Sequence, residues 1–132
     1  MNVIRPVSLA AAFVLAASLA LTSVPALASG GDDDRVIRTG GCSGSADWKL
    51  KVKTDDGRLE VEGEVDSNRS GQTWAWKLKD NGKVVVKGSS TTGGRSGSFS
   101  VERKIANRAG TDKVVFKATH GAQTCRGVIR FG

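Results

Sequence analysis

Residues that commonly act as catalysts are scarce in this chain. It has one histidine, two cysteines and no tyrosine. His120 lies between polar and small residues, a setting typical of a surface turn, and no G-x-S-x-G motif supplies a nucleophile. The carboxylates at 60, 62 and 64 alternate with apolar residues and so share one flat strand face, while Glu102 and Asp112 are isolated in the sequence. We therefore expect no enzymatic activity, no metal site and no cofactor.

The first 28 residues have the three parts of a secretory signal peptide. Arg5 stands near the start, an apolar run follows, and Ala26 and Ala28 form an A-x-A cleavage site. The alternative is a retained membrane anchor, because the apolar run approaches the roughly 20 residues that span a bilayer. The A-x-A site favours cleavage after Ala28. We expect a secreted protein, extracellular or cell-wall associated, with no membrane span after the signal is removed.

The remaining chain predicts a polar leader at 29–41, with a short edge strand at 36–39, and one domain at 42–132. Its two cysteines, Cys42 and Cys125, lie near opposite ends of that domain. An even cysteine count in an exported protein predicts a disulfide. The alternative, a metal or redox pair, would need a C-x-x-C spacing or further ligands.

Alternation defines the first hairpin. In WKLKVKTDDGRLEVEGEV, residues 48–65, lysines alternate with apolar residues before an Asp-Gly pair, and glutamates alternate with them afterwards. Such alternation predicts half-buried strands, and Asp-Gly is a preferred two-residue type I′ turn. The resulting register pairs opposite charges on the outer face: Lys53–Glu60, Lys51–Glu62 and Lys49–Glu64. We interpret that face as solvated and neutral, and not as a binding surface.

Five more strands follow, separated by Gly, Asn and Asp turns. Their inward residues are Trp74, Trp76 and Leu78; Val84 and Val86; Phe99, Val101 and Ile105; Val114, Phe116 and Ala118; and Cys125, Gly127, Ile129 and Phe131. At 80–82 we expect a three-residue turn that pairs Leu78 with Val84. Arg103 falls on the inward phase, so we expect a bulge at 102–104, and GSSTTGGRSG (88–97) predicts a flexible loop. About seven principal strands without helical periodicity indicate an all-β antiparallel sandwich or barrel.

The three tryptophans lie on the apolar phase of their strands. Core packing is the favoured interpretation of Trp48, Trp74 and Trp76, and stacking on sugars is the alternative. We expect Trp74, at the loop end of its strand, to be the partly exposed one.

The cations are distributed unevenly. Removing the signal, whose single charge is Arg5, lowers the net charge of +7 by one unit. The second sheet should carry cations and no acid on its outer face: Lys77, Lys79, Lys113, Lys117, Arg126 and Arg130. Such a face can hold an anionic polymer through several salt-sensitive contacts. The alternative is a solvated, lysine-protected sheet. Nucleic acid is not favoured, because no aromatic residues alternate with the cations.

Two stretches carry a resemblance to known proteins. AGTDKVVFKATHGAQTCRGVIRF (109–131) looks like the last two strands of an immunoglobulin-like domain, and the resemblance in architecture covers Cys42 onward. CSG-DWKLK, VEGEVDSNR-GQ-W and TCRG together resemble small exported proteins of Gram-positive bacteria, a family without an assigned activity. The resemblance implies export, the Cys42–Cys125 disulfide and an immunoglobulin-like β-sandwich, and it implies no mechanism.

These observations predict a secreted, non-catalytic interaction module. Its expected partner is an anionic cell-envelope polymer, held on the basic face of the second sheet, or another extracellular protein. The alternative function is a small inhibitor of an extracellular hydrolase, acting through the loop at 66–72 or the loop at 88–97.

Overall fold

The computed structural model describes residues 34–132, which form eight β-strands and, within that range, no helix. The strands are β1 (Arg35–Gly41), β2 (Asp47–Asp55), β3 (Arg58–Asp66), β4 (Thr73–Asp80), β5 (Lys83–Thr91), β6 (Ser98–Ala106), β7 (Asp112–His120) and β8 (Gln123–Phe131). The expected signal peptide, 1–28, lies outside the described residues. The stretch expected to form an edge strand is the middle of β1.

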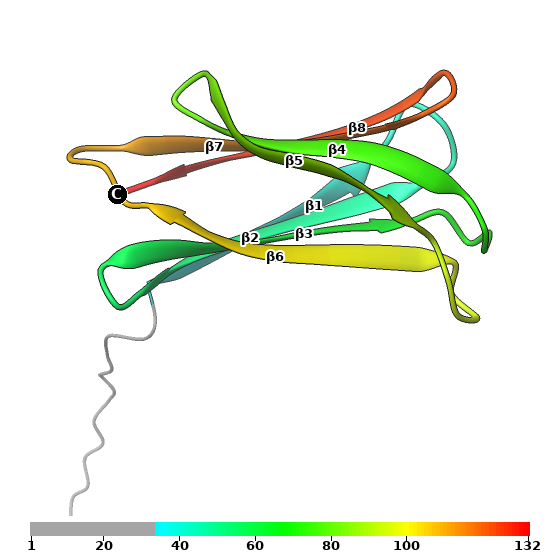
Figure 1. Cartoon of the computed structure of the whole chain (residues 1–132), viewed down its shortest axis with the longest axis horizontal. Helices are drawn as coiled ribbons and strands as arrows, with labels where there is room; N and C mark the ends of the chain where they lie inside the picture. The colour runs from blue at the N-terminus through cyan, green and yellow to red at the C-terminus, as the bar shows by residue number, and fades with distance from the viewer. Residues whose placement is uncertain (1–33) are drawn as a thin grey trace, which may run out of the picture. The chain divides into compact units, whose positions relative to one another are not determined.

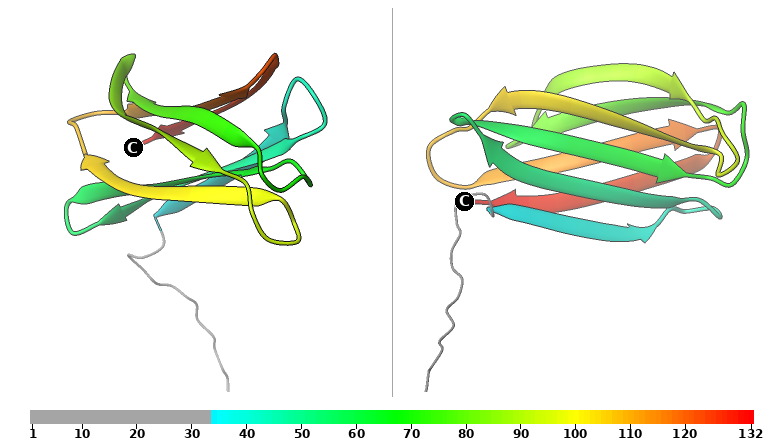
Figure 2. Two further views of the ribbon diagram at one scale, coloured as in Figure 1. Left: turned by 45° about the vertical axis from the view of Figure 1, so that its right-hand side comes forward. Right: turned by 90° about the horizontal axis from the view of Figure 1, so that it is seen from below.

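Two four-stranded antiparallel sheets pack as a sandwich, as predicted (Figure 1). One sheet has the order β1-β2-β3-β6 and the other the order β5-β4-β7-β8. Seen from below, β1 and β6 are the two edges of the nearer sheet (Figure 2). Alternate residues of both sheets point inward, and the largest fully buried side chains are Trp74, Phe116 and Leu50. No helix in the described range is long and apolar enough to cross a membrane.

The first hairpin has the predicted register. Lys53 lies opposite Glu60, and Trp48 lies opposite Val65. Asp56 and Gly57 both have positive φ, 55° and 78°, as a type I′ turn requires. The turn type and the alternation agree on one register, because a slip by one residue would turn the apolar row to water.

The prediction for the second hairpin was wrong. The turn has two residues, Asn81 and Gly82, with φ of 52° and 89°. Leu78 pairs with Val86, and a register shift follows between Leu78 and Lys79. The twist of a type I′ turn matches that of the strands, and the bulge restores the inward phase of Val86. Val84 consequently faces outward and is 48% exposed.

Two expectations at β5 and β6 were also wrong. Residues 88–91, expected in a loop, continue β5. β6 pairs regularly with β3 and has no bulge at 102–104. β6 is an edge strand, so the side chain of the inward-phase Arg103 can extend past the edge of the core and remain exposed. Its Cζ lies 5.3 Å from the centroid of the Trp76 ring, a cation–π contact.

The tryptophans pack as the core interpretation predicts, with one correction. Trp74 is fully buried, and Trp48 is the partly exposed one. The Trp48 ring lies against two strand glycines, Gly40 of β1 and Gly127 of β8, where any Cβ would come within 3 Å of the indole. Trp74 is instead covered by His120 and Phe99, whose ring centroids lie 5.3 and 6.4 Å away.

The predicted disulfide joins Cys42 to Cys125 across 83 positions of sequence. It ties the segment after β1 to β8 of the other sheet. The Ser43 N–H donates to the Thr124 carbonyl (2.8 Å), and the Gln123 Oε1 accepts from the Ala46 N–H (2.8 Å). The bond and these contacts close one side of the sandwich.

Candidate anion-binding face

The outer face of sheet β5-β4-β7-β8, called here the basic face, carries seven cations and no carboxylate among the described residues. They are Lys77, Lys79, Lys87, Lys113, Lys117, Arg126 and Arg130. The fold brings all six predicted cations to this one face. None of them takes part in an ion pair within residues 34–132.

Four of these cations form a continuous line across the sheet, called here the cation row. Lys87 lies opposite Lys77, Lys77 opposite Lys117, and Lys117 opposite Arg126. Strands lie about 4.8 Å apart, so the row extends over about 14 Å. Like charges directly opposite one another destabilise a sheet, and the row repeats that arrangement three times.

A less charged band follows the cation row. Lys79 lies between Val84 and Val115, and Val115 lies opposite Val128. Val115 is buried although it faces away from the core, as expected where long lysine stems cover neighbouring apolar surface. Beyond this band, Lys113 lies opposite Arg130.

The other side of the cation row is hollowed. A shallow cavity of about 530 Å³ is lined by Ala75, Trp76, Lys77, Lys87, Gly88, Lys117 and Thr119. Only short side chains stand in the row beside the cations, where Ser89, Ala75, Thr119 and Thr124 lie opposite one another. This row is called here the small-residue trough.

Sequence reasoning missed Lys87 and the trough. The sequence predicts this face from three strands and gives no indication that β5 belongs to the same sheet. The apolar residues Val84 and Val86 mark a strand, but they do not reveal which strand lies beside it. A trough is a property of sheet order, and no short motif encodes it.

The outer face of β1-β2-β3-β6 is different, because its charges largely neutralise one another. Ion pairs join Lys51 to Glu62 (3.2 Å), Lys53 to Glu60 (3.4 Å) and Lys104 to Asp55 (3.0 Å). A hydrogen bond between the Glu60 and Glu102 carboxyls lowers the pKa of Glu60 and raises that of Glu102. Glu102 is therefore not isolated, contrary to the sequence interpretation.

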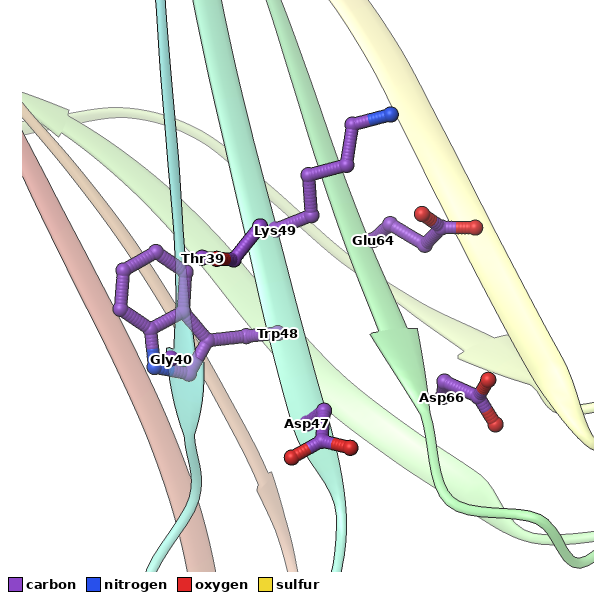
Figure 3. A pocket seen from close by; sticks show the side chains of 7 residues that line it. All are labelled: Thr39, Gly40, Asp47, Trp48, Lys49, Glu64 and Asp66. Atoms are coloured by element: carbon purple, nitrogen blue, oxygen red, sulfur yellow. The ribbon is translucent and has the colours of Figure 1, made fainter.

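A second hollow, of about 410 Å³, lies at the end of this neutral face (Figure 3). Asp47 and Asp66 lie opposite one another there, beside Lys49 and Glu64. The Trp48 side chain points toward β1, and its indole overlaps the ribbon at Gly40 in this view. The described residues contain no group of three His, Cys, Asp or Glu side chains arranged to hold a metal ion.

Asp112 is also not isolated, contrary to the sequence interpretation. It is fully buried at the start of β7, beside buried Asp80 at the end of β4. Burial, followed by the neighbouring Asp112 carboxyl, raises the pKa of Asp80 to about 6, and Arg108 opposes the shift. The Arg108 Nε lies 3.6 Å from Asp80 Oδ2. The backbone N–H of Arg108 donates to both carboxylate oxygens of Asp112 (3.3 Å).

His120 closes the Trp74 side of the core. Its Nδ1 lies 2.8 Å from the Thr73 carbonyl, and its ring covers the Trp74 indole. No free cysteine lies in the described residues. These contacts give His120 a packing role at the end of β7.

Comparisons with known proteins identify no relative. No family model, no curated protein and no solved structure matches this chain.

Proposed function

We propose that the protein is a secreted, non-catalytic binding module that engages an anionic polymer of the cell envelope through its basic face. The observation that supports this is the cation row, four directly opposed cations without a neighbouring carboxylate. An anionic chain laid along the row would replace repulsion between like charges by attraction to the ligand. The leader sequence supports secretion, and so does a disulfide, which persists in oxidising compartments.

The fold belongs, in this proposal, to the broad immunoglobulin-like class. When β1 is set aside and the other strands are numbered from one to seven, the sheets have the orders 1-2-5 and 4-3-6-7. An immunoglobulin constant domain has the orders 1-2-5-4 and 3-6-7. The two patterns differ only in the fourth strand, here β5, which pairs with β4 and extends the basic face.

The test uses two charge-reversal variants with equal changes in net charge. One carries Lys77→Glu, Lys117→Glu and Arg126→Glu on the basic face. The matched control carries Arg38→Glu, Arg69→Glu and Arg95→Glu, three exposed cations outside that face. Both are incubated with isolated cell-envelope polymer at low and high salt, and circular dichroism checks that each is folded.

The unchanged protein and the control should bind at low salt and be released by a few tenths molar salt, because counterion release makes such binding steeply salt-dependent. The basic-face variant should lose binding. Equal binding by the basic-face variant and the control would refute the proposal.

A second candidate, a small inhibitor of an extracellular hydrolase, has one supporting observation. The loop after β3 and the loop after β5 are joined to each other. The Ser67 N–H donates to the Gly97 carbonyl (2.9 Å), and the Thr92 hydroxyl donates to the Arg69 carbonyl (2.6 Å). Preorganised loops lose less entropy on binding. A panel of secreted hydrolases, assayed with the unchanged protein and with Arg69→Glu/Arg95→Glu, tests this candidate.

A further inference from the structure

The small-residue trough adds a second element to the basic face. Ser89, Ala75, Thr119 and Thr124 run parallel to the cation row, one step along the strands from it. The hollow of about 530 Å³ covers part of both rows, because Lys77, Lys87 and Lys117 line it together with Ala75 and Thr119. A chain lying across the strands would therefore meet cations along one side and short side chains beneath it.

The trough offers hydroxyl groups to such a chain. Within residues 34–132, no hydrogen bond to another protein group uses the side-chain hydroxyl of Ser89, Thr119 or Thr124, in contrast to Thr73 and Thr91, which bond to each other (3.1 Å). Each free hydroxyl can donate one hydrogen bond and accept others. Trp76 is among the residues that line the hollow, but it lies on the inward phase of β4 and is buried, so we do not expect recognition by stacking on its ring.

We propose, on the basis of the proposed function, that the ligand is a linear polyanion whose repeating unit carries hydroxyl groups, such as an acidic polysaccharide or a polyol phosphate. It lies in the trough across the strands, with its anionic groups on the cation row and its hydroxyl groups on Ser89, Thr119 and Thr124. A polyanion without hydroxyl groups would use the cations alone and bind more weakly. The pair Lys113–Arg130 lies outside this path, because the row of Val84, Lys79, Val115 and Val128 separates it from the cation row.

The experiment compares ligands and variants in one binding assay. Oligogalacturonate is measured against oligoglutamate with the same number of carboxylates, and oligomeric glycerol phosphate against linear polyphosphate of equal charge. Ala75→Phe fills the trough without changing any charge, and Val84→Phe is its matched control on the same face, at an exposed position beyond the cation row. Thr119→Val removes one hydroxyl and keeps the shape of the side chain.

Ala75→Phe should weaken binding of at least one hydroxylated polyanion by about tenfold, and Val84→Phe by less than about twofold. Thr119→Val should reduce the preference for that polyanion over its hydroxyl-free counterpart. Lys113→Gln/Arg130→Gln should bind more tightly than Lys77→Gln/Lys117→Gln. Binding of oligogalacturonate would indicate a carboxylate polymer, and binding of oligomeric glycerol phosphate would indicate a phosphate polymer.

Two other outcomes separate this inference from the proposed function. If the charge reversals at Lys77, Lys117 and Arg126 abolish binding while Ala75→Phe leaves it unchanged, or if hydroxyl-free polyanions bind equally well, the trough has no role and the basic face remains. If the charge reversals also bind normally, both proposals fall.

Discussion

At the scale of single residues, glycines within strands decide where the aromatic rings lie. A Cβ at Gly127 would come 2.5 Å from the Trp48 ring, one at Gly63 would come 2.6 Å from Phe116, and one at Gly88 would come 2.8 Å from Trp76. Alternation in the sequence placed Gly127 inward, but it could not identify the ring above it. For Gly127 and Gly63 that information depends on which strand of the opposite sheet lies over the glycine, and for Gly88 it depends on β4, the neighbouring strand of its own sheet.

Gly127→Ala and Gly63→Ala should each destabilise the protein by about 1–3 kcal/mol, because a methyl group at either position overpacks the core against a ring. Gly93→Ala is the control, since a Cβ at that position would have no neighbour within 4 Å and the φ of Gly93 is not positive. It should change stability by less than about 0.5 kcal/mol. Urea unfolding measures all three, and equal losses at Gly93 and Gly127 would contradict the packing argument.

The buried pair Asp80 and Asp112 makes stability depend on pH. The pKa of Asp80 is about 6 in the folded protein, against an ordinary value of 3.8. Between these values the folded state holds a proton that the unfolded state has lost, so the stabilising contribution falls as pH rises from about 4 to about 6. The Oδ1 of Asp80 has no hydrogen-bond partner within the described residues, so no hydrogen bond at that oxygen offsets the burial of the charged form.

Asp80→Asn should remove this pH dependence, because an amide can donate to Asp112 at every pH. Above pH 6 the variant should be the more stable protein, by on the order of 1–2 kcal/mol after screening by solvent. The groups beside the site are Arg108, Asp112 and Lys83, and all are kept. Thermal unfolding at intervals from pH 4 to pH 7 provides the measurement, and parallel curves for the two proteins would show that Asp80 is not the source of the pH dependence.

At the scale of elements, the two hairpins show what alternation predicts and where it fails. Around residues 56–57 the turn chemistry and both apolar rows agree on one register, and the sequence prediction was confirmed. Around residues 80–83 they conflict, because a type I′ turn at Asn81-Gly82 puts Val84 outside. The turn geometry prevails there, and a bulge absorbs the difference. Bulges of this kind depend on a balance between turn and packing energies that alternation does not contain.

Arg103 shows a second limit of alternation. It is a cation on the inward phase of β6, and this edge strand accommodates it without a bulge. Arg103→Ala should cost about 0.5–1 kcal/mol, the value of an exposed cation–π contact, and should shift tryptophan fluorescence by exposing Trp76. Arg95→Ala, an exposed arginine in the loop before β6, serves as control and should do neither. A fluorescence change of equal size in both variants would rule out the contact as its cause.

At the scale of the whole molecule, the two outer faces divide the charge unequally. Lysines opposite glutamates neutralise the face of β1-β2-β3-β6, while seven cations stand without a carboxylate on the basic face. The sequence predicted six of these seven because strand phase alone decides which face a residue joins. It could not predict the cation row as a continuous line, because this depends on the registers of three strand pairs and on β5 lying beside β4.

This asymmetry predicts which lysines a bound polymer protects. Acetylation of the free protein and of the protein bound to cell-envelope polymer, followed by mass spectrometry of peptides, compares the lysines of the two faces within a single molecule. Lys77, Lys87 and Lys117 should react several-fold more slowly in the bound protein, because a chain along the cation row covers their ammonium groups. Lys49, Lys51 and Lys53, on the neutral face, should react equally in both states and serve as the internal control. Because both sets belong to one chain, unfolding or aggregation would change them together, and only contact with the basic face can slow one set alone. Protection of Lys49, Lys51 and Lys53 instead would place the ligand on the opposite sheet.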